Sequence, residues 1–166
     1  RPCGVCNIDF NGYYSNPLYY AHNLYLNGTL ITELVIPDSV TSIGEDAFRG
    51  CTGLESITLP FVGANKDGTS NTHFGYIFGA SSYSSNYSYV PSSLKTVIIS
   101  GGKRIASSAF SSCTGLTSIT LPFVGDGINN GIHFGYIFGA SSYSYNSSNV
   151  PASLKTVVIT GGTSIE

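Results

Sequence analysis

The chain has 166 residues, 42% of them apolar, which is enough for one domain with a core of its own. Only 10% of the residues are charged, the net charge is -2, and the seven Lys and Arg residues are scattered rather than clustered. Without a basic patch, the chain lacks the electrostatic features of a protein that binds nucleic acid or an anionic membrane. It also lacks an apolar run of about 18 residues, so no membrane insertion is expected from this sequence.

Residues 1–30 differ from the rest of the chain and are predicted to form an N-terminal cap. Asn27 and Gly28 stand between two apolar runs, which is the strongest short signal of a β-hairpin. We predict a hairpin over residues 18–36 that starts the sheet and covers its edge. Such a cap is needed because the first unit of a repeat array otherwise exposes an apolar face.

Residues 31–166 are predicted to form an array of repeats. The twelve letters HFGYIFGASSYS at residues 73–84 return unchanged at residues 133–144. A shorter phrase with apolar residues at its first, fourth and sixth places begins at residues 31, 54, 94, 116 and 154. This pattern describes a strand with three side chains turned inward, and five such strands would stack as a parallel ladder.

The phrase L-x-x-L-x-L is the core pattern of a leucine-rich repeat. Its starts alternate between short intervals of 22–23 residues and long intervals of 38–40 residues. The predicted fold is α/β: a horseshoe-like leucine-rich-repeat solenoid, mostly β, with a parallel sheet, short helical or 3₁₀ turns and long irregular loops. Because Gly161-Gly162 matches Gly101-Gly102, after which a further repeat follows, we expect the chain to be a fragment of a longer array.

The short and long turns both place side chains in the core. Ala47-Phe48 and their counterparts Ala109-Phe110 are predicted to face inward on one helical or 3₁₀ turn. In the long turns, Phe74 and Phe78 are predicted to take inward places. The additional residues fall into loops at residues 64–72 and 80–92 and their counterparts at 126–132 and 140–153. The first loop differs in length between the copies, which marks it as solvent-exposed.

The cysteines form two groups with different interpretations. Cys51 and Cys113 lie two strands apart, about 10 Å by sheet spacing, which exceeds the roughly 4.4–6.8 Å that a disulfide allows. They are therefore interpreted as buried thiols. Cys3 and Cys6 have redox or zinc spacing, but no second ligand pair follows. A local disulfide is favoured there over a metal or redox centre, and the pairing is left open.

The phrase IPDSVTSIGEDAFRGCTGL, from Ile36 to Leu54, closely resembles the repeat of the BspA-like leucine-rich-repeat proteins, which are mostly bacterial surface antigens. The resemblance covers residues 31–60 and 94–122, whereas the long turns depart from the standard repeat length. It implies a secreted or surface-anchored binding protein, extracellular or on the bacterial cell surface, with adhesion to host or matrix proteins as the usual role. The chain is also rich in Tyr, Ser, Gly, Asn and Thr, a composition that is common in extracellular bacterial proteins.

Catalysis and metal binding are not expected. The acidic residues lie mostly in turns without a facing pair, and no nucleophile, base and orienting group can be assembled. His73 and His133 are interpreted as structural histidines because each stands beside Phe rather than a carboxylate. The loops at residues 65–71 and 126–131 carry one carboxylate each, which favours Asx turns over calcium sites. The prediction is no enzyme, no metal and no cofactor.

Two surfaces are candidate binding sites. The first is a patch of loop tyrosines, whose mixture with Ser, Asn and Gly is typical of antibody loops; its members are Tyr83, Tyr87, Tyr89, Tyr143 and Tyr145. The second is the outward side of the strands on the concave face, with members Ser56, Thr58, Thr96, Ile98, Ser118, Thr120, Thr156 and Val158. The alternatives are that the rings only shield the solenoid and that Thr and Val simply suit exposed strands.

The predicted function is non-enzymatic recognition or adhesion at a cell surface, with a protein or glycan ligand, including a host or matrix protein. Repeated weak contacts would act through avidity. The alternative is a passive stalk or spacer that displays other domains. Exposed loop tyrosines whose removal weakens binding would favour recognition, and loops that accept any polar residue would favour the spacer.

Overall fold

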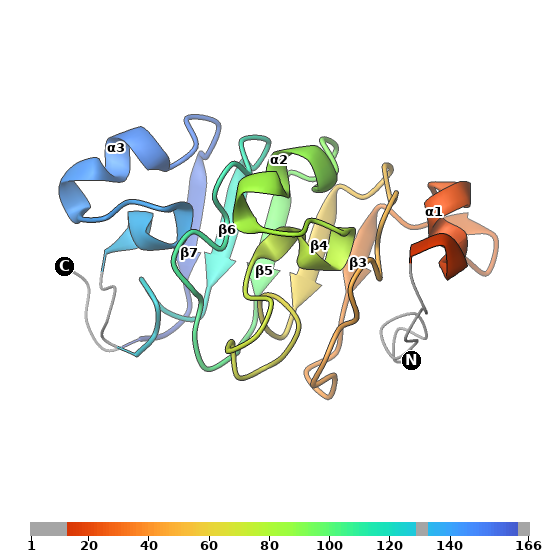
Figure 1. The fold of residues 1–166 in the computed structure, drawn as a ribbon, viewed down its shortest axis with the longest axis horizontal. Coiled ribbons are helices and arrows are strands. Elements are labelled where there is room, and N and C mark those ends of the chain that lie inside the picture. Colours follow the sequence, from red (N-terminus) through yellow and green to blue (C-terminus); the bar gives the residue numbers. More distant parts are fainter. Residues whose placement is uncertain (1–12, 129–132, 163–166) are drawn as a thin grey trace.

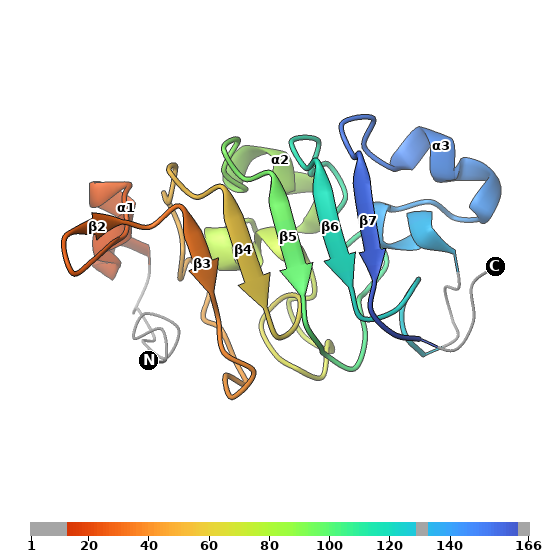
Figure 2. The same ribbon diagram turned by 180° about the vertical axis from the view of Figure 1, so that it is seen from behind.

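The structure is a computed structural model that describes residues 13–128 and 133–162. Cys3 and Cys6 lie outside the described residues, as does the end of the loop predicted at residues 126–132. Five strands form one parallel sheet in chain order, and Figures 1 and 2 show them side by side along the long axis of the molecule. They are β3 (Glu33–Val35), β4 (Ser56–Leu59), β5 (Thr96–Ile99), β6 (Ser118–Leu121) and β7 (Thr156–Ile159). The structure therefore confirms the predicted parallel ladder.

The three central strands use alternate residues for the core. In β4, β5 and β6, buried residues alternate with half-exposed ones, because successive side chains point to opposite faces of the sheet. The register is constant, since Ile57 pairs with Val97 and Val97 with Ile119. Equivalent residues of successive repeats thus form straight columns on both faces.

A ladder of phenylalanine rings fills the space between the sheet and the turns. Phe74 and Phe78 are fully buried, as predicted, on η3 (Phe74–Phe78), and Phe138 is buried on η5 (Phe134–Phe138). The ring centroids of Phe74 and Phe110 lie 4.9 Å apart, and those of Phe110 and Phe138 lie 6.2 Å apart. Consecutive repeats are therefore joined by aromatic contacts as well as by the sheet.

The short turn around Ala47 is a series of hydrogen-bonded turns rather than the helical or 3₁₀ turn that was predicted. The amide N–H of Arg49 donates to the carbonyl of Asp46, and that of Cys51 to the carbonyl of Phe48. Asp46 has a φ of 62°, in the left-handed region, which interrupts any regular right-handed helix. Ala47 and Phe48 are fully buried, so the predicted inward positions are confirmed.

The loops predicted as irregular at residues 80–92 and 140–153 contain short helices. The first carries η4 (Tyr83–Ser85) and α2 (Asn86–Tyr89). The second carries η6 (Tyr143–Tyr145) and α3 (Asn146–Asn149). Figure 1 shows α1, α2 and α3 spaced along the same side of the sheet, and Figure 2 shows the strands from the opposite side. The molecule is thus a sheet layer covered on one face by turns and helical segments.

The N-terminal region differs in part from the prediction. The hairpin forms at the predicted Asn-Gly turn, with antiparallel β1 (Tyr25–Leu26) and β2 (Thr29–Leu30). The prediction that it spans residues 18–36 and starts the sheet is wrong, because β1 and β2 form a separate two-stranded sheet. Residues 13–21 instead carry η2 (Tyr13–Ser15) and α1 (Pro17–Ala21). Leu18 of α1 is buried in the core and covers its first repeat.

Candidate binding site

The two predicted surfaces occupy opposite faces of the sheet. The outward strand residues lie in register in two columns, which are Glu33, Ser56, Thr96, Ser118, Thr156 and Val35, Thr58, Ile98, Thr120, Val158. Most of those in β4, β5 and β6 are half-exposed. The loop tyrosines lie on the helical segments of the other face. A ligand that touched both candidate surfaces would have to reach around the sheet.

Four of the five predicted loop tyrosines project into solvent. Tyr87 is 71% exposed and Tyr143 is 72% exposed, and Tyr83 and Tyr145 are also exposed. Tyr89 is half-buried and packs against the core. The alternative that the rings mainly shield the solenoid therefore describes Tyr89 better than the other four.

An asparagine anchors each tyrosine loop: Asn86, which is fully buried, and Asn146, which is half-buried. The side-chain oxygen of Asn86 accepts from the amide of Gly75, and its Nδ2 group donates to the carbonyls of Ala109 and Ser111. Asn146 accepts from the amide of Gly135 in the same way. These bonds tie the start of each short helix to the turn before it, and for Asn86 also to the next repeat. The exposed rings therefore stand on a fixed backbone.

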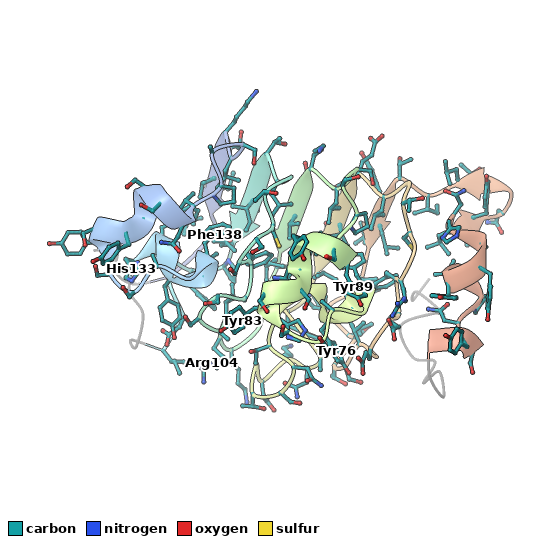
Figure 3. All side chains as sticks on the ribbon, turned by 45° about the horizontal axis from the view of Figure 1, so that its top comes forward. Tyr76, Tyr83, Tyr89, Arg104, His133 and Phe138 are labelled. Atoms are coloured by element: carbon teal, nitrogen blue, oxygen red, sulfur yellow. The ribbon has the colours of Figure 1, made fainter. Side chains whose placement is uncertain are left out.

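The structure brings two of the loop tyrosines together with the N-terminal cap. A groove of about 660 Å³ runs between α1, the short turn at residues 49–52 and the segment at residues 87–92. Tyr19 and Tyr20 line it from α1, and Tyr87 and Tyr89 line it from the opposite wall. Figure 3 labels Tyr89 beside the green helical segment of the first long turn. The groove has the size of a small-molecule or oligosaccharide site.

Arg49 connects the two walls of this groove. Its guanidinium carbon lies 5.1 Å from the ring centroid of Tyr19 and 5.2 Å from that of Tyr89, which is cation–π distance on both sides. Its Nη1 lies 2.9 Å from Oδ1 of the buried Asp46. Burial lowers the pKa of Arg49, but the hydrogen bond and charge of Asp46 outweigh this effect and raise it above its ordinary value. The groove thus contains a fixed positive group flanked by aromatic faces.

Sequence reasoning identified Tyr87 and Tyr89 but missed the other residues of the groove. Tyr19 and Tyr20 were not singled out, because residues 18–36 were predicted as a hairpin and not as a helix beside the first long turn. Arg49 was also missed, although a signal was present in the sequence: the second short turn has Ser111 at the equivalent place. Comparing the copies for differences rather than for identities would have found it.

The residues interpreted as structural have structural partners. His73 donates from Nε2 to the carbonyl of Ala80 at 2.6 Å, and Nδ1 of His133 lies 3.0 Å from the side-chain oxygen of Asn146. Both histidines therefore fix the loops that follow them. Cys51 and Cys113 are buried and remain thiols, as predicted.

The predicted Asx turns also form. The side-chain oxygen of Asn65 accepts from the amide of Gly68, and that of Asp126 accepts from the amide of Ile128. Within residues 13–128 and 133–162, no group of three His, Cys, Asp or Glu side chains is placed to share a metal ion. No helix in the described part of the chain is both long and apolar enough to cross a membrane.

The parallel sheet and its alternating turns define a leucine-rich-repeat solenoid. The family described as BspA type leucine rich repeat region matches residues 21–74 and 81–157, in six copies. The chain therefore belongs to this family, as the resemblance of its repeat indicated. Repeats of this family are typically protein-binding or surface-associated scaffolds rather than enzymes. Searches of curated proteins and of solved structures gave no match.

Proposed function

We propose that the chain is a non-enzymatic recognition module that acts in adhesion at a cell surface and binds a protein or glycan. The observation that carries the proposal is the set of exposed tyrosines held on anchored helical segments. Tyrosine offers a large rigid contact area with a polar end at low entropic cost. A backbone fixed by Asn86 lowers the cost of ordering that contact on binding.

Family membership supports the same class of function and the same location. Protein-binding roles are typical of this family, which supports a host or matrix protein as the ligand. Surface-associated roles are also typical, which supports an extracellular or cell-surface location. The half-exposed outer sheet face, with Thr58, Thr96 and Thr120 among its members, is a second possible contact surface. It offers few charged groups, so its contribution would be smaller than that of the tyrosines.

A passive spacer is the second candidate function. Its support is the near identity of the two long turns and the continuous phenylalanine ladder, which make each unit a rigid step of the same kind. Such a spacer needs stacking but not exposed aromatic rings.

A binding screen separates the two functions. The protein is tested against purified matrix proteins and glycans beside a variant with Tyr87→Ser and Tyr145→Ser, both at exposed positions. If the tyrosine loops recognise the ligand, the unmodified protein binds it and this variant does not. Binding that the variant keeps would move the contact to the sheet face, where Thr58→Lys and Thr120→Lys would then abolish it. Absence of binding by the unmodified protein would favour the spacer.

A further inference from the structure

The two long turns share almost all of their sequence, and their differences gather at the groove. Between residues 73–100 and 133–160, six positions differ. Three of these six, occupied in the first copy by Tyr87, Tyr89 and Ser92, line the groove. The second copy has Ser, Asn and Ala at these places. The shared framework of the turn therefore does not require the groove-lining side chains.

Several other residues that form the groove are also not repeated in the second copy. Arg49 stands where the second short turn has Ser111, and its partner Asp46 stands where that turn has Ser108. Tyr19 and Tyr20 come from α1, which belongs to the cap and not to a repeat. Within the described residues, the combination of four tyrosine rings with one guanidinium therefore occurs once, whereas the loop residue Tyr83 recurs as Tyr143.

From the chemistry of this lining we propose that the groove binds a glycan, an inference that rests on the recognition function proposed above. A pyranose ring has a flat face of C–H groups bounded by hydroxyls. Tyrosine rings match the flat face, and the hydroxyls of Thr52, Ser88 and Ser92 with the guanidinium of Arg49 match the polar rim. Among the described residues, no carboxylate lines the groove, so neutral and acidic sugars both fit its charge.

A peptide ligand fits the same groove less well. The central contacts of a protein interface are usually side chains buried in dry, well-packed pockets. Here the aliphatic lining consists of Val90 and Pro91, and the groove is open to solvent along the exposed rings of Tyr20 and Tyr87. A shallow groove with aromatic faces and hydroxyl edges suits a ligand that is itself flat and hydroxylated.

The residues of the groove have distinct roles in this proposal. Tyr20 is 64% exposed and Tyr87 is 71% exposed, so their rings are the surfaces on which a sugar would stack. Tyr19 and Tyr89 have the guanidinium of Arg49 over their rings and therefore position it. Arg49 then presents hydrogen-bond donors to the groove from its place between the rings of Tyr19 and Tyr89.

The test uses the absence of tryptophan from the chain. A Tyr87→Trp variant reports binding through its own fluorescence and keeps an aromatic face at the site. It is titrated with hexasaccharides of chitin, cellulose, amylose and β-1,3-glucan, and with N-glycans released from matrix glycoproteins. We expect at least one of these probes to shift the tryptophan emission, and we expect Tyr87→Ser or Tyr20→Ser to weaken that interaction by about tenfold or more, measured by calorimetry.

Tyr25→Ser is the matched control, because Tyr25 is exposed, does not line the groove and is not one of the loop tyrosines proposed to bind. This variant should bind the same probe unchanged. If none of the probes binds, or if Tyr87→Ser and Tyr20→Ser bind as well as the unmodified protein, the inference is wrong. A third outcome is that a matrix protein binds the unmodified chain equally well before and after enzymatic deglycosylation, and that the groove variants lose this binding. The ligand is then a peptide surface. The glycan inference then fails while the recognition function stands.

Discussion

The first and second long turns have the same twelve-residue motif in different surroundings. In the first copy Phe74 and Asn86 are fully buried, whereas in the second copy Phe134 and Asn146 are half-buried. The first copy has a short turn on each side, because α2 lies between the turn that contains Arg49 and the turn that contains Ser111. The burial of each motif is therefore set by its neighbours, as expected for a solenoid in which each unit contacts only adjacent units.

The surfaces of the two copies diverge while their frameworks agree. The carbonyl of Tyr76 accepts from the amide of Asp46, and the carbonyl of Tyr136 accepts from the amide of Ser108. Equivalent backbone bonds therefore join both long turns to the preceding short turn. In the described part of the chain, the first copy alone adds an ion pair and cation–π contacts beside these bonds. The shared backbone bonds are therefore part of the repeated fold, whereas the contacts of Arg49 are an addition at the first copy.

The largest expected effect comes from the shared phenylalanine. Phe74→Ala removes a ring that packs 4.9 Å from Phe110, and it should lower the free energy of unfolding by about 3–5 kcal/mol. Phe134→Ala removes the same residue of the same motif but should cost only about 1–2 kcal/mol, since part of that ring is already exposed. Urea unfolding of both variants measures the difference. If both variants lose the same free energy of unfolding, burial by neighbouring repeats does not determine how much each phenylalanine contributes to stability.

The anchoring asparagines should show the next largest effect. Asn86→Ala leaves the amide of Gly75 and the carbonyl of Ser111 without the Asn86 side chain, while the carbonyl of Ala109 loses one bond and keeps the amide of Phe74. We expect a loss of about 3 kcal/mol, because each unpaired buried group costs roughly 1–3 kcal/mol.

Asn146→Ala is the paired measurement. Its hydrogen-bond partners among the described residues, the amide of Gly135 and the ring of His133, lie within the second long turn itself. This variant should lose about 1 kcal/mol. A thermal melt that ranks the two variants in the opposite order would contradict the role of Asn86 as a link between repeats.

A smaller effect is expected at Arg49. Arg49→Ser gives the first short turn the residue of the second, but it leaves the carboxylate of Asp46 buried without its ion pair. Breaking a partly buried pair in this way should cost about 2 kcal/mol. Adding Asp46→Ser copies Ser108 and Ser111 of the second short turn and should recover most of the loss. Chemical unfolding of both single variants and the double variant gives the coupling energy. Additive costs would show that the pair is not coupled.

The sequence predicted the array better than the site, and the reason is physical. The strands follow from a local pattern, since Leu54, Ile57 and Leu59 must face inward together and repetition fixes their register. The prediction of exposed tyrosines at Tyr87 and Tyr145 follows from their polar context in the same local way. The groove instead depends on the position of α1, which the chain fixes through tertiary contacts.

The cap illustrates why such contacts are not readable from a local pattern. Asn16 is fully buried and donates from Nδ2 to the carbonyl of Asp46, thirty residues away. Leu18 is buried against the first repeat, and the amide of Thr52 donates to the carbonyl of His22. A five-residue helix with an Asn-Pro start has little periodicity of its own. Its placement, and with it the groove, is decided by these long-range bonds.

The last expected effect is absent below about pH 9 and concerns the thiol that links the first long turn to the second short turn. Burial raises the pKa of Cys113 to about 12 from an ordinary value of 9.0, and the hydrogen bond from Asn86 lowers it only in part. Below pH 9 the thiol is protonated in both the folded and the unfolded chain. Above pH 9 the unfolded chain ionises first, so stability should fall by about 1.4 kcal/mol per pH unit towards pH 12.

Cys113→Ala isolates this contribution, because the tyrosines that also titrate above pH 9 are the same in both proteins. The difference in unfolding free energy between the two proteins should be constant up to about pH 9 and should then narrow as the pH rises. Parallel stability curves from pH 8 to pH 11 would show that the thiol of Cys113 reaches solvent in the folded state. Such a result would require the contact between the first long turn and the second short turn to open, and it would weaken the assignment of Asn86 as the link between them.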